Sequence, residues 1–306
     1  MPTRHALVPS EQGRDLLGPP PDGVHVSVWE PSAPPPPEAA EAGFWVPQYL
    51  SAPALGEQLP ALPRLEVVQL LTAGADAFVG GLPDGVLLCD ARGVHGSPTS
   101  EWVLAAILAS VRELPSFVLD QQRRQWNQRF TGELAGRRVL VVGAGDVGEQ
   151  IRRRLLPFDV TVTMVARRAR PDAHGVDELP DLLPEADVVA VVVPLTQQTR
   201  GLVDAAFLAR MPDGALLVNG ARGPVADTAA LVAELSTGRL RAALDVTDPE
   251  PLPPDHPLWT VPGLLLTPHI GGAVPGFPRR AYRLVRDQLA RWASGQPLRN
   301  VVENGY

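Results

Sequence analysis

The chain has 306 residues, of which 45% are hydrophobic and 20% charged, and its formal net charge is −7. This length predicts two domains. The negative charge argues against nonspecific nucleic-acid binding. No apolar run reaches the roughly 20 residues that a membrane span needs. Cys89 is the single cysteine, so no intrachain disulfide can form, and the first residues lack the pattern of a secretory signal. We therefore expect a cytoplasmic protein in which Cys89 packs as a small hydrophobe.

The chain contains no lysine, so all 27 basic residues are arginine. A Walker A phosphate loop, a pyridoxal Schiff base and the Tyr–Lys pair of short-chain dehydrogenases each require a lysine amine. All three kinds of site are therefore excluded.

The first 90 residues alternate short apolar runs with proline-rich turns. Pro34–Pro37 can propagate neither a helix nor a strand ladder, and it is interpreted as a stiff surface loop or as a ligand for a polyproline-binding partner. The expected strands are His5–Val8, Val24–Trp29, Phe44–Val46, Leu65–Leu71 and Val86–Cys89.

From Ser97 the apolar spacing becomes helical. One helix is predicted from there to Pro115, and a second, more polar helix from Pro115 to about Arg129. The strands expected after these helices are Arg138–Val142, Val160–Val165, Val188–Val193, Ala215–Val218, Ala242–Val246 and Leu264–Leu266. The further helices expected are Val147–Leu156, Ala205–Arg210, Thr228–Ser236 and Arg279–Ser294.

Strands that are apolar on both faces and alternate with helices predict an α/β protein with parallel sheets covered on both sides. We expect two Rossmann-like, doubly wound domains with a cleft between them. The predicted substrate domain comprises residues 1–93 and 277–306, and the predicted dinucleotide domain comprises residues 94–276.

A glycine-rich turn, Gly143-Ala144-Gly145-Asp146-Val147-Gly148, follows one expected strand and opens a helix. In this context the three glycines permit a tight turn, close approach of the backbone to a pyrophosphate, and close helix–strand packing. The helix N-terminus adds amides and partial positive charge for phosphates. The pattern favours a dinucleotide site over a plain tight turn.

The next strand ends in Ala166-Arg167-Arg168, where an NAD site normally carries an acidic residue for the ribose hydroxyls. Guanidinium groups can instead pair with a 2′-phosphate. We therefore predict that NADP(H) is preferred and that NAD(H) use is possible; the alternative is that Arg167 and Arg168 are solvated loop residues.

Three polar residues, Arg222, Glu250 and His269, follow apolar runs in the last third of the chain. Taken singly, they also fit a surface arginine, an exposed loop acid and a structural histidine. Together they could hold an anionic carbonyl compound and protonate its oxygen. No metal site is expected.

From Gly143 to Gly272 the chain resembles the D-isomer-specific 2-hydroxyacid dehydrogenase family. The departure at Arg167 and Arg168 resembles its NADP-preferring glyoxylate and hydroxypyruvate reductases, and the first 60 residues match least. The motifs that carry the resemblance are the glycine turn, Val193–Thr196 with Thr199, Asn219–Gly223, Asp245–Pro251, Thr267–Gly272, and upstream Thr72–Asp76 and Thr99–Glu101.

The resemblance implies that Arg222 binds the substrate carboxylate and polarises the keto oxygen. It implies that His269 exchanges a proton with that oxygen and that Glu250 orients the imidazole and favours its charged form. Further implied contacts are those of Pro194, Thr199, Ala221, Asp245 and Thr99 with the cofactor and of the Ala73 and Gly74 amides with the substrate. A homodimer joined through the helices after Ser97 is also implied.

Two other functions remain open. A phosphoglycerate dehydrogenase would need an electropositive phosphate pocket, which the N-terminal residues do not indicate. The chain end at Tyr306 would also leave little room for the regulatory domain that some such enzymes carry. Phosphite oxidation is a more remote alternative. A nucleotide-sensing protein like the corepressors of this fold would bind NADPH without turnover.

Overall fold

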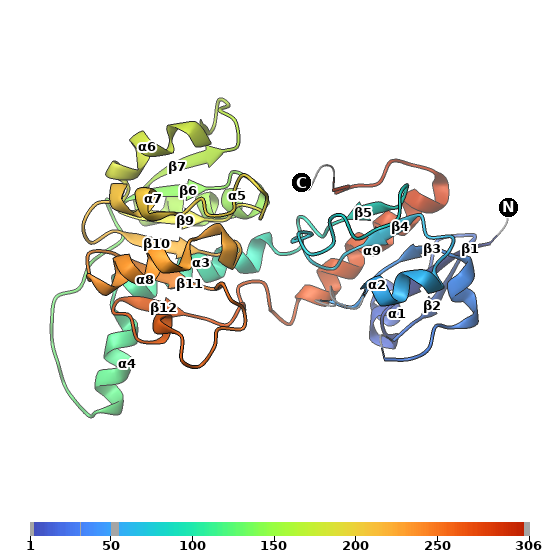
Figure 1. Cartoon of the computed structure of the whole chain (residues 1–306), viewed down its shortest axis with the longest axis horizontal. Coiled ribbons are helices and arrows are strands. Elements are labelled where there is room, and N and C mark those ends of the chain that lie inside the picture. Colours follow the sequence, from blue (N-terminus) through green and yellow to red (C-terminus); the bar gives the residue numbers. More distant parts are fainter. Residues whose placement is uncertain (1–2, 31, 50–54, 303–306) are drawn as a thin grey trace. The chain divides into compact units, whose positions relative to one another are not determined.

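A computed structural model describes residues 3–30, 32–49 and 55–302. The chain forms two compact units (Figure 1). Unit 1 comprises Met1–His95 and Pro275–Tyr306, and unit 2 comprises Gly96–Val274.

Unit 1 is built on a five-stranded sheet in the order β2-β1-β3-β4-β5, with every pairing parallel. Its strands are β1 (Arg4–Val8), β2 (Val24–Val28), β3 (Ala42–Trp45), β4 (Val67–Gln69) and β5 (Leu87–Cys89). Its helices are α1 (Glu11–Leu17), α2 (Leu55–Gln58) and α9 (Phe277–Ser294). Ala6 and Val8 pack on the side of α9, while Leu7 packs on the other side with Trp45, so each face of the sheet has its own core.

Unit 2 is built on a seven-stranded parallel sheet in the order β12-β11-β10-β9-β6-β7-β8 (Figure 1). The strands are β6 (Arg138–Val142), β7 (Thr161–Ala166), β8 (His174–Gly175), β9 (Val188–Val191), β10 (Leu216–Asn219), β11 (Arg241–Leu244) and β12 (Leu264–Leu266). The helices are α3 (Gly96–Val111), α4 (Leu114–Gln122), α5 (Asp146–Leu155), α6 (Leu179–Leu182), α7 (Ala205–Arg210) and α8 (Thr228–Ser236). The chain progresses outward from β6 through β7 and β8, then returns to β9 on the other side of β6. The topological switch point, where open α/β sheets bind ligands, therefore lies between β6 and β9.

Strand β6 shows why the sheet of unit 2 is covered on both faces. Val139 and Val141 pack into one buried cluster, and Leu140 and Val142 pack into another. Because successive side chains of a strand point to opposite faces, a strand that is apolar at every position requires helices on both sides. The predicted doubly wound parallel-sheet architecture is confirmed for each unit.

Several expected elements differ from those observed. The helix predicted from Pro115 to Arg129 is α4, which ends at Gln122; Arg124 has a positive φ of 57°, which a continuing helix cannot accommodate. The strands expected at Leu65–Leu71 and Val188–Val193 are shorter, and Pro37 begins a short 3₁₀ helix, Pro37–Glu41. Helices α1, α2 and α6 and strand β8 were not predicted, since they are short and carry little periodic signal.

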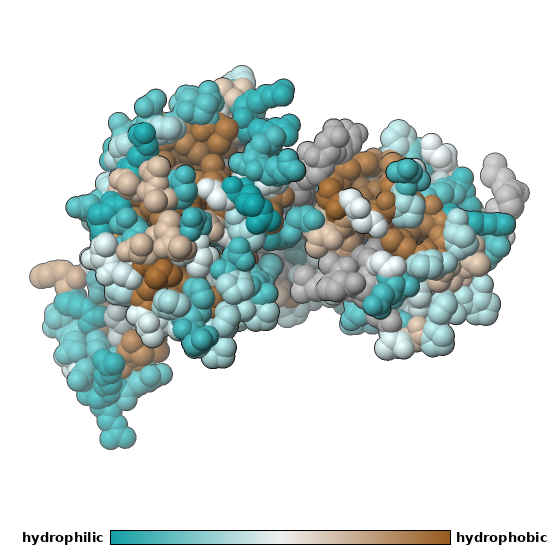
Figure 2. Space-filling view, viewed as in Figure 1, coloured by the Kyte–Doolittle hydropathy of each residue, from teal (hydrophilic) through white to brown (hydrophobic). Residues whose placement is uncertain are grey.

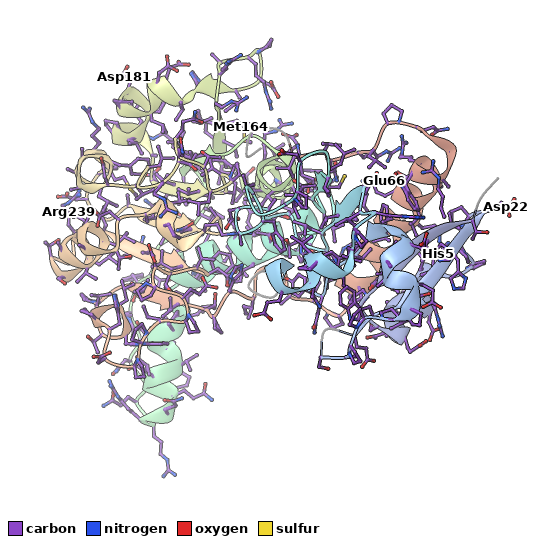
Figure 3. All side chains as sticks on the ribbon, turned by 45° about the vertical axis from the view of Figure 1, so that its right-hand side comes forward. His5, Asp22, Glu66, Met164, Asp181 and Arg239 are labelled. Carbon is purple, nitrogen blue, oxygen red and sulfur yellow. The ribbon has the colours of Figure 1, made fainter. Side chains whose placement is uncertain are left out.

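Cys89 and Arg239 illustrate how the two units are stabilised. Cys89 is fully buried in the core of unit 1, which confirms that it packs as a small hydrophobe, and this burial raises the pKa of its thiol to about 12. In unit 2, Arg239 (Figure 3) donates hydrogen bonds to the carbonyls of Leu208 and Met211 and to Glu234 at 2.8, 2.6 and 2.6 Å. Its guanidinium thereby satisfies carbonyls at the end of α7.

No single helix of the described residues is long and apolar enough to span a membrane; α3 and α4 meet the length and composition criteria only as a pair bent by 65°. On the face seen in Figure 2, hydrophilic side chains predominate on the surface of each unit, with apolar patches between them.

Candidate active site

The glycine turn connects β6 to α5 at the switch point of unit 2. Gly143 has φ of +120°, and a Cβ there would lie 2.7 Å from the Val192 carbonyl oxygen; a Cβ on Gly148 would lie 1.8 Å from the Gly143 oxygen. Protein packing therefore requires glycine at both positions. At Gly145, by contrast, a Cβ would meet no protein atom within 4 Å, and φ is −91°. The protein itself gives no reason for glycine at Gly145, which is consistent with a ligand approaching the backbone there.

Helix α5 begins with Asp146 and has no side-chain cap at Gly145. The first backbone amides of α5 therefore have no capping side chain to accept their hydrogen bonds. Helix N-termini that bind phosphate leave their amides available in the same way. The Asp146 carboxylate lies against the start of α3, where a Cβ on Gly96 would come within 2.0 Å of it. For Asp146 and Val147, the backbone amides are therefore the groups that can bind a phosphate.

Arg167 and Arg168 follow β7 and are both exposed. Among the residues that the structure describes, neither side chain makes a hydrogen bond or an ion pair. Arg170, three residues after Arg167, does so: its Nη2 donates to the carbonyl of Ala144 in the glycine turn at 2.9 Å.

The loop after β9 and the residues near it were expected to contact the cofactor. Thr199 Oγ1 donates to the Pro194 carbonyl at 2.6 Å and accepts from the Thr196 amide at 2.8 Å, so its side chain shapes this loop. Ala221 is buried after β10, and Thr99 is half-buried on α3. In unit 1, Ala73 and Gly74 lie beyond the carboxyl end of β4, where Thr72 Oγ1 donates to the Gly74 carbonyl at 2.7 Å.

Arg222 lies just beyond the carboxyl end of β10 in a turn formed by Asn219. The buried Asn219 side chain accepts from the Ala221 amide at 3.0 Å and donates to the Arg222 carbonyl at 3.2 Å. A Cβ on Gly223 would lie 1.9 Å from the Thr247 oxygen, so glycine permits close approach of the loop that carries Glu250. The role of Asn219 was not predicted from the sequence; an amide side chain at the end of an apolar strand is the signal that could have revealed it.

Glu250 and His269 meet directly, with Glu250 Oε1 and His269 Nδ1 2.5 Å apart. They come from the loops after β11 and β12, which are neighbours in the sheet. Because Nδ1 contacts the carboxylate, Nε2 is the ring nitrogen left to exchange a proton with a substrate.

The charge of Glu250 depends on several neighbours. Burial raises the pKa of this carboxyl, but the hydrogen bond and charge of His269 lower it. The Thr247 amide and the charge of Arg222 lower it further, and the pKa lies below its ordinary value. The charge of Arg222 thus helps to keep Glu250 ionised.

Asp245 holds the turn that carries His269. Its carboxylate, which is 4% exposed, accepts from Thr267 Oγ1 and from the amides of Ile270 and Gly271 at 2.7, 2.9 and 2.7 Å. The His269 amide donates to the Asp245 carbonyl at 2.7 Å.

His269 itself has φ of +54°, in the left-handed region that non-glycine residues rarely adopt. The hydrogen bonds to Asp245 explain why this conformation persists, since strained backbone at a site must be determined by its surroundings. Asp245 therefore orients the histidine, a function beyond the cofactor contact expected of it.

The chemistry available at these strand ends is narrow. An arginine, an ionised carboxylate and an imidazole can bind an anion and transfer one proton, and they lie in the same unit as a phosphate-type turn. Among residues 3–30, 32–49 and 55–302, no group of three or more His, Cys, Asp or Glu side chains is arranged to hold a metal ion.

Comparison with known proteins decides the family. Residues 104–271 match the model for the NAD-binding domain of D-isomer specific 2-hydroxyacid dehydrogenases. The chain belongs to this family. It is an oxidoreductase, and its unit 2 is the nicotinamide dinucleotide-binding domain of the family.

Curated relatives extend the match. A glyoxylate reductase from Thermofilum pendens is 34% identical over 257 residues, which are 78% of this chain and 75% of the relative. A D-3-phosphoglycerate dehydrogenase from Archaeoglobus fulgidus is 31% identical over 80% of this chain. The chain spans about half the length of that dehydrogenase, 49%.

Solved structures of the family show the same architecture. A D-isomer specific 2-hydroxyacid dehydrogenase from Xanthobacter autotrophicus, in complex with NADPH and MES, is 30% identical with a TM-score of 0.84 and full coverage of both chains, 100% each. An NADPH-dependent glyoxylate/hydroxypyruvate reductase from Sinorhizobium meliloti, in complex with NADP and sulfate, is 26% identical with a TM-score of 0.86 and covers 99% of this chain and 100% of its own.

Proposed function

We propose that this protein reduces a 2-keto acid to a D-2-hydroxy acid with NADPH, with glyoxylate or hydroxypyruvate as the substrate type. The observation that carries the proposal is the His269–Glu250 pair, held at the carboxyl ends of β11 and β12 by Asp245 and lying within the electrostatic reach of Arg222. Family members named glyoxylate reductase and NADPH-dependent glyoxylate/hydroxypyruvate reductase support the substrate type.

The residues of the glycine turn fit a dinucleotide. Gly145 is open to a ligand, and the uncapped amides of α5 offer donors for the pyrophosphate. We assign Gly143, Gly145, Asp146, Val147 and Gly148 to this site. We also assign to it the residues that the resemblance named, which are Pro194, Thr199, Ala221, Asp245 and Thr99.

When bound, the nicotinamide supplies the hydride. In our proposal the Arg222 guanidinium binds the substrate carboxylate and polarises the keto oxygen. His269 gives a proton from Nε2 to that oxygen, and the Glu250 carboxylate at Nδ1 orients the ring and balances its positive charge. In unit 1, the amides of Ala73 and Gly74 are proposed to bind the substrate carboxylate, which makes residues 1–93 and 277–306 the substrate domain.

The proposed preference for NADP rests on charge. The segment after β7 presents arginines where an acidic residue would repel a 2′-phosphate, and two structural relatives were solved with NADPH or NADP. NAD(H) use remains possible within this proposal at lower kcat/KM.

We further propose a cytoplasmic homodimer joined through α3, α4 and the segment after α4. Trp126 and Phe130 in this segment are 95% and 103% exposed. Large aromatic side chains without burial in the monomer are typical of an interface. A monomer by light scattering at micromolar concentration would refute this assembly.

The test is a panel of 2-keto acids assayed by nicotinamide absorbance with NADPH and with NADH. We expect turnover of glyoxylate or hydroxypyruvate and a higher kcat/KM with NADPH. Equal kcat/KM for the two cofactors would refute the NADP preference. Tight NADPH binding without turnover of any 2-keto acid would favour a nucleotide sensor.

Phosphoglycerate oxidation is the second candidate, because the D-3-phosphoglycerate dehydrogenase from Archaeoglobus fulgidus is 31% identical over 80% of this chain. Faster oxidation of 3-phosphoglycerate than reduction of any unphosphorylated 2-keto acid would support this activity and refute our proposal.

A further inference from the structure

A four-residue turn between β7 and β8 brings an arginine and an aspartate together beside the glycine turn. The Arg170 amide donates to the Ala173 carbonyl at 2.8 Å, and the Ala173 amide donates to the Arg170 carbonyl at 3.1 Å. The turn is therefore closed at both ends, and buried Ala173 anchors it. Its backbone places Arg170 and Asp172 without help from a ligand.

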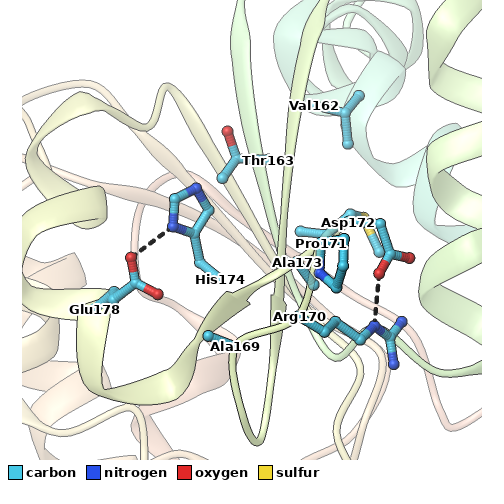
Figure 4. Close-up of a pocket in the computed structure, with 10 residues that line it drawn as sticks. Val162, Thr163, Ala169, Arg170, Pro171, Asp172, Ala173, His174 and Glu178 are labelled. Carbon is cyan, nitrogen blue, oxygen red and sulfur yellow. Dashed lines mark hydrogen bonds and ion pairs between the residues drawn. The ribbon is translucent and has the colours of Figure 1, made fainter.

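The Arg170 guanidinium has two partners. Its Nη2 donates to the Ala144 carbonyl at 2.9 Å, and its Nε donates to Asp172 Oδ1 at 2.9 Å (Figure 4). The Arg170 and Asp172 side chains are 46% and 66% exposed. The pair lines an open hollow of about 380 Å³, and a separate pair, His174 and Glu178, also lines it.

The contact with Ala144 determines where this guanidinium lies in a dinucleotide site. In Rossmann domains the glycine turn binds the pyrophosphate, and the residues after the second strand face the 2′-position of the adjacent ribose. Arg170 is attached to that turn, whereas no hydrogen bond or ion pair of Arg167 or Arg168 is found in the described part of the chain. Arg170 is thus the arginine of this segment that is held against the glycine turn.

We propose that Arg170 binds the 2′-phosphate of NADP and that Asp172 competes with the phosphate for the same guanidinium. Asp172 would then weaken the affinity for NADP and limit the preference over NAD. This inference rests on the proposed NADP-dependent function. Because the Arg170–Asp172 pair is largely exposed, solvent screens it, and a dianionic phosphate that offers three acceptor oxygens can displace the carboxylate.

The test uses adenosine 2′,5′-bisphosphate and adenosine 5′-monophosphate as probes, titrated calorimetrically into the full chain and its variants. Arg170→Gln should raise the Kd of the bisphosphate by roughly 10- to 100-fold through loss of charge-assisted hydrogen bonds. Asp172→Asn should lower the same Kd by about 2- to 5-fold, as expected for removal of an exposed competing pair. The monophosphate Kd should change far less in both variants.

Matched controls remove a charge elsewhere in unit 2. Arg153→Gln on α5 and Asp181→Asn on α6 are exposed, and neither residue belongs to the turn. Both variants should bind the two probes as the wild type does.

An unchanged bisphosphate Kd in Arg170→Gln would overturn the inference and leave the proposed function intact, provided that the wild type binds the bisphosphate more tightly than the monophosphate. Weaker bisphosphate binding in Asp172→Asn would show that Asp172 orients Arg170, which would overturn the competition. Equal affinity of the wild type for both probes would overturn the NADP preference together with this inference.

Discussion

Unit 2 contains two histidine–glutamate pairs that look alike at close range. His269 and Glu250 are 2.5 Å apart, and His174 and Glu178 are 2.7 Å apart, each through Nδ1. Their side chains are also similarly exposed, 37% and 40% in the first pair and 47% and 42% in the second. In both pairs the pKa of the glutamate is lowered.

The two pairs differ in what surrounds them. His174 and Glu178 are four residues apart, and the pKa of Glu178 is lowered first by the hydrogen bond from His174 and then by the Gly175 amide. His269 and Glu250 come from separate loops at the ends of β11 and β12, and their imidazole is fixed by Asp245. A histidine–glutamate contact is therefore not in itself evidence of a catalytic site. What sets the His269 pair apart is its fixed backbone and an arginine whose charge acts on the glutamate.

Replacing each of the two histidines should produce the largest difference in activity between the pairs. His269→Ala should lower kcat/KM by about 10²–10⁴-fold, the usual contribution of an acid–base group. His174→Ala should leave kcat/KM for the 2-keto acid unchanged at saturating NADPH, since its imidazole is paired with Glu178 and lines the hollow beside Arg170 rather than the ends of β11 and β12. Steady-state kinetics with NADPH and a 2-keto acid measure both, and equal losses would invalidate the distinction.

Arg222 should have the next largest effect, because it is proposed to bind the substrate carboxylate through two charge-assisted hydrogen bonds. Arg222→Gln should lower kcat/KM by about 10²-fold or more, with a large part of the loss in KM. Arg210→Gln on α7, at an exposed arginine of unit 2, serves as its control. A normal KM in Arg222→Gln would remove Arg222 from substrate binding.

Asp245 tests whether the strained histidine turn matters. An asparagine has one carbonyl oxygen and a donor group that would face a backbone amide, so Asp245→Asn should reduce the free energy of unfolding by about 1–3 kcal/mol. Its kcat should also fall, because His269 loses its orientation. Denaturant unfolding and kinetics check both effects, with exposed Asp248→Asn as control. A stable, fully active variant would contradict the orienting role.

The glutamates should show the smallest effect on activity and a clear effect on pH dependence. Because the pKa of Glu250 lies below its ordinary 4.5, the ionised form stabilises the folded state fully above that pH and loses this effect as pH falls through the lower folded value. Glu250→Gln should flatten this part of the stability–pH curve and lower kcat/KM on the order of 10-fold.

Glu178→Gln tests whether the two histidine–glutamate pairs differ in function. The pKa of Glu178 is also lowered, so its loss should flatten the acid side of the stability–pH curve in the same direction. Its kcat/KM should remain that of the wild type. An activity loss as large as that of Glu250→Gln would mean that the two pairs are not functionally distinct.

The sequence predicted the sheets well where strands are apolar at every position, as in Arg138–Val142 and Val188–Val191. The prediction failed where elements are short or where a single residue determines where a helix ends. Helix α4, for example, ends at Gln122, shortly before Arg124 with its positive φ. The sequence also predicted Arg222, Glu250 and His269 as site residues from their order along the chain, and the structure brings Glu250 and His269 together.

What the sequence could not predict is the set of contacts that hold those residues. Asn219 shapes the turn of Arg222, Asp245 holds His269 in a left-handed conformation, and Arg170 reaches Ala144 across 26 residues. Each contact joins segments that are brought together only when parallel strands align their carboxyl ends, so no local pattern reveals it.

In the proposed reaction, hydride passes directly from NADPH to a 2-keto acid while His269 supplies the proton. The most direct measurement is reduction of hydroxypyruvate with NADPH deuterated at nicotinamide C4, with mass and chiral analysis of the product. We predict D-glycerate that carries one deuterium at C2, formed by the wild type and by His174→Ala but orders of magnitude more slowly by His269→Ala. Product without deuterium, whichever hydrogen of nicotinamide C4 carries the label, would contradict direct hydride transfer. L-glycerate would contradict the proposed stereochemistry, and an undiminished rate in His269→Ala would contradict the role of His269.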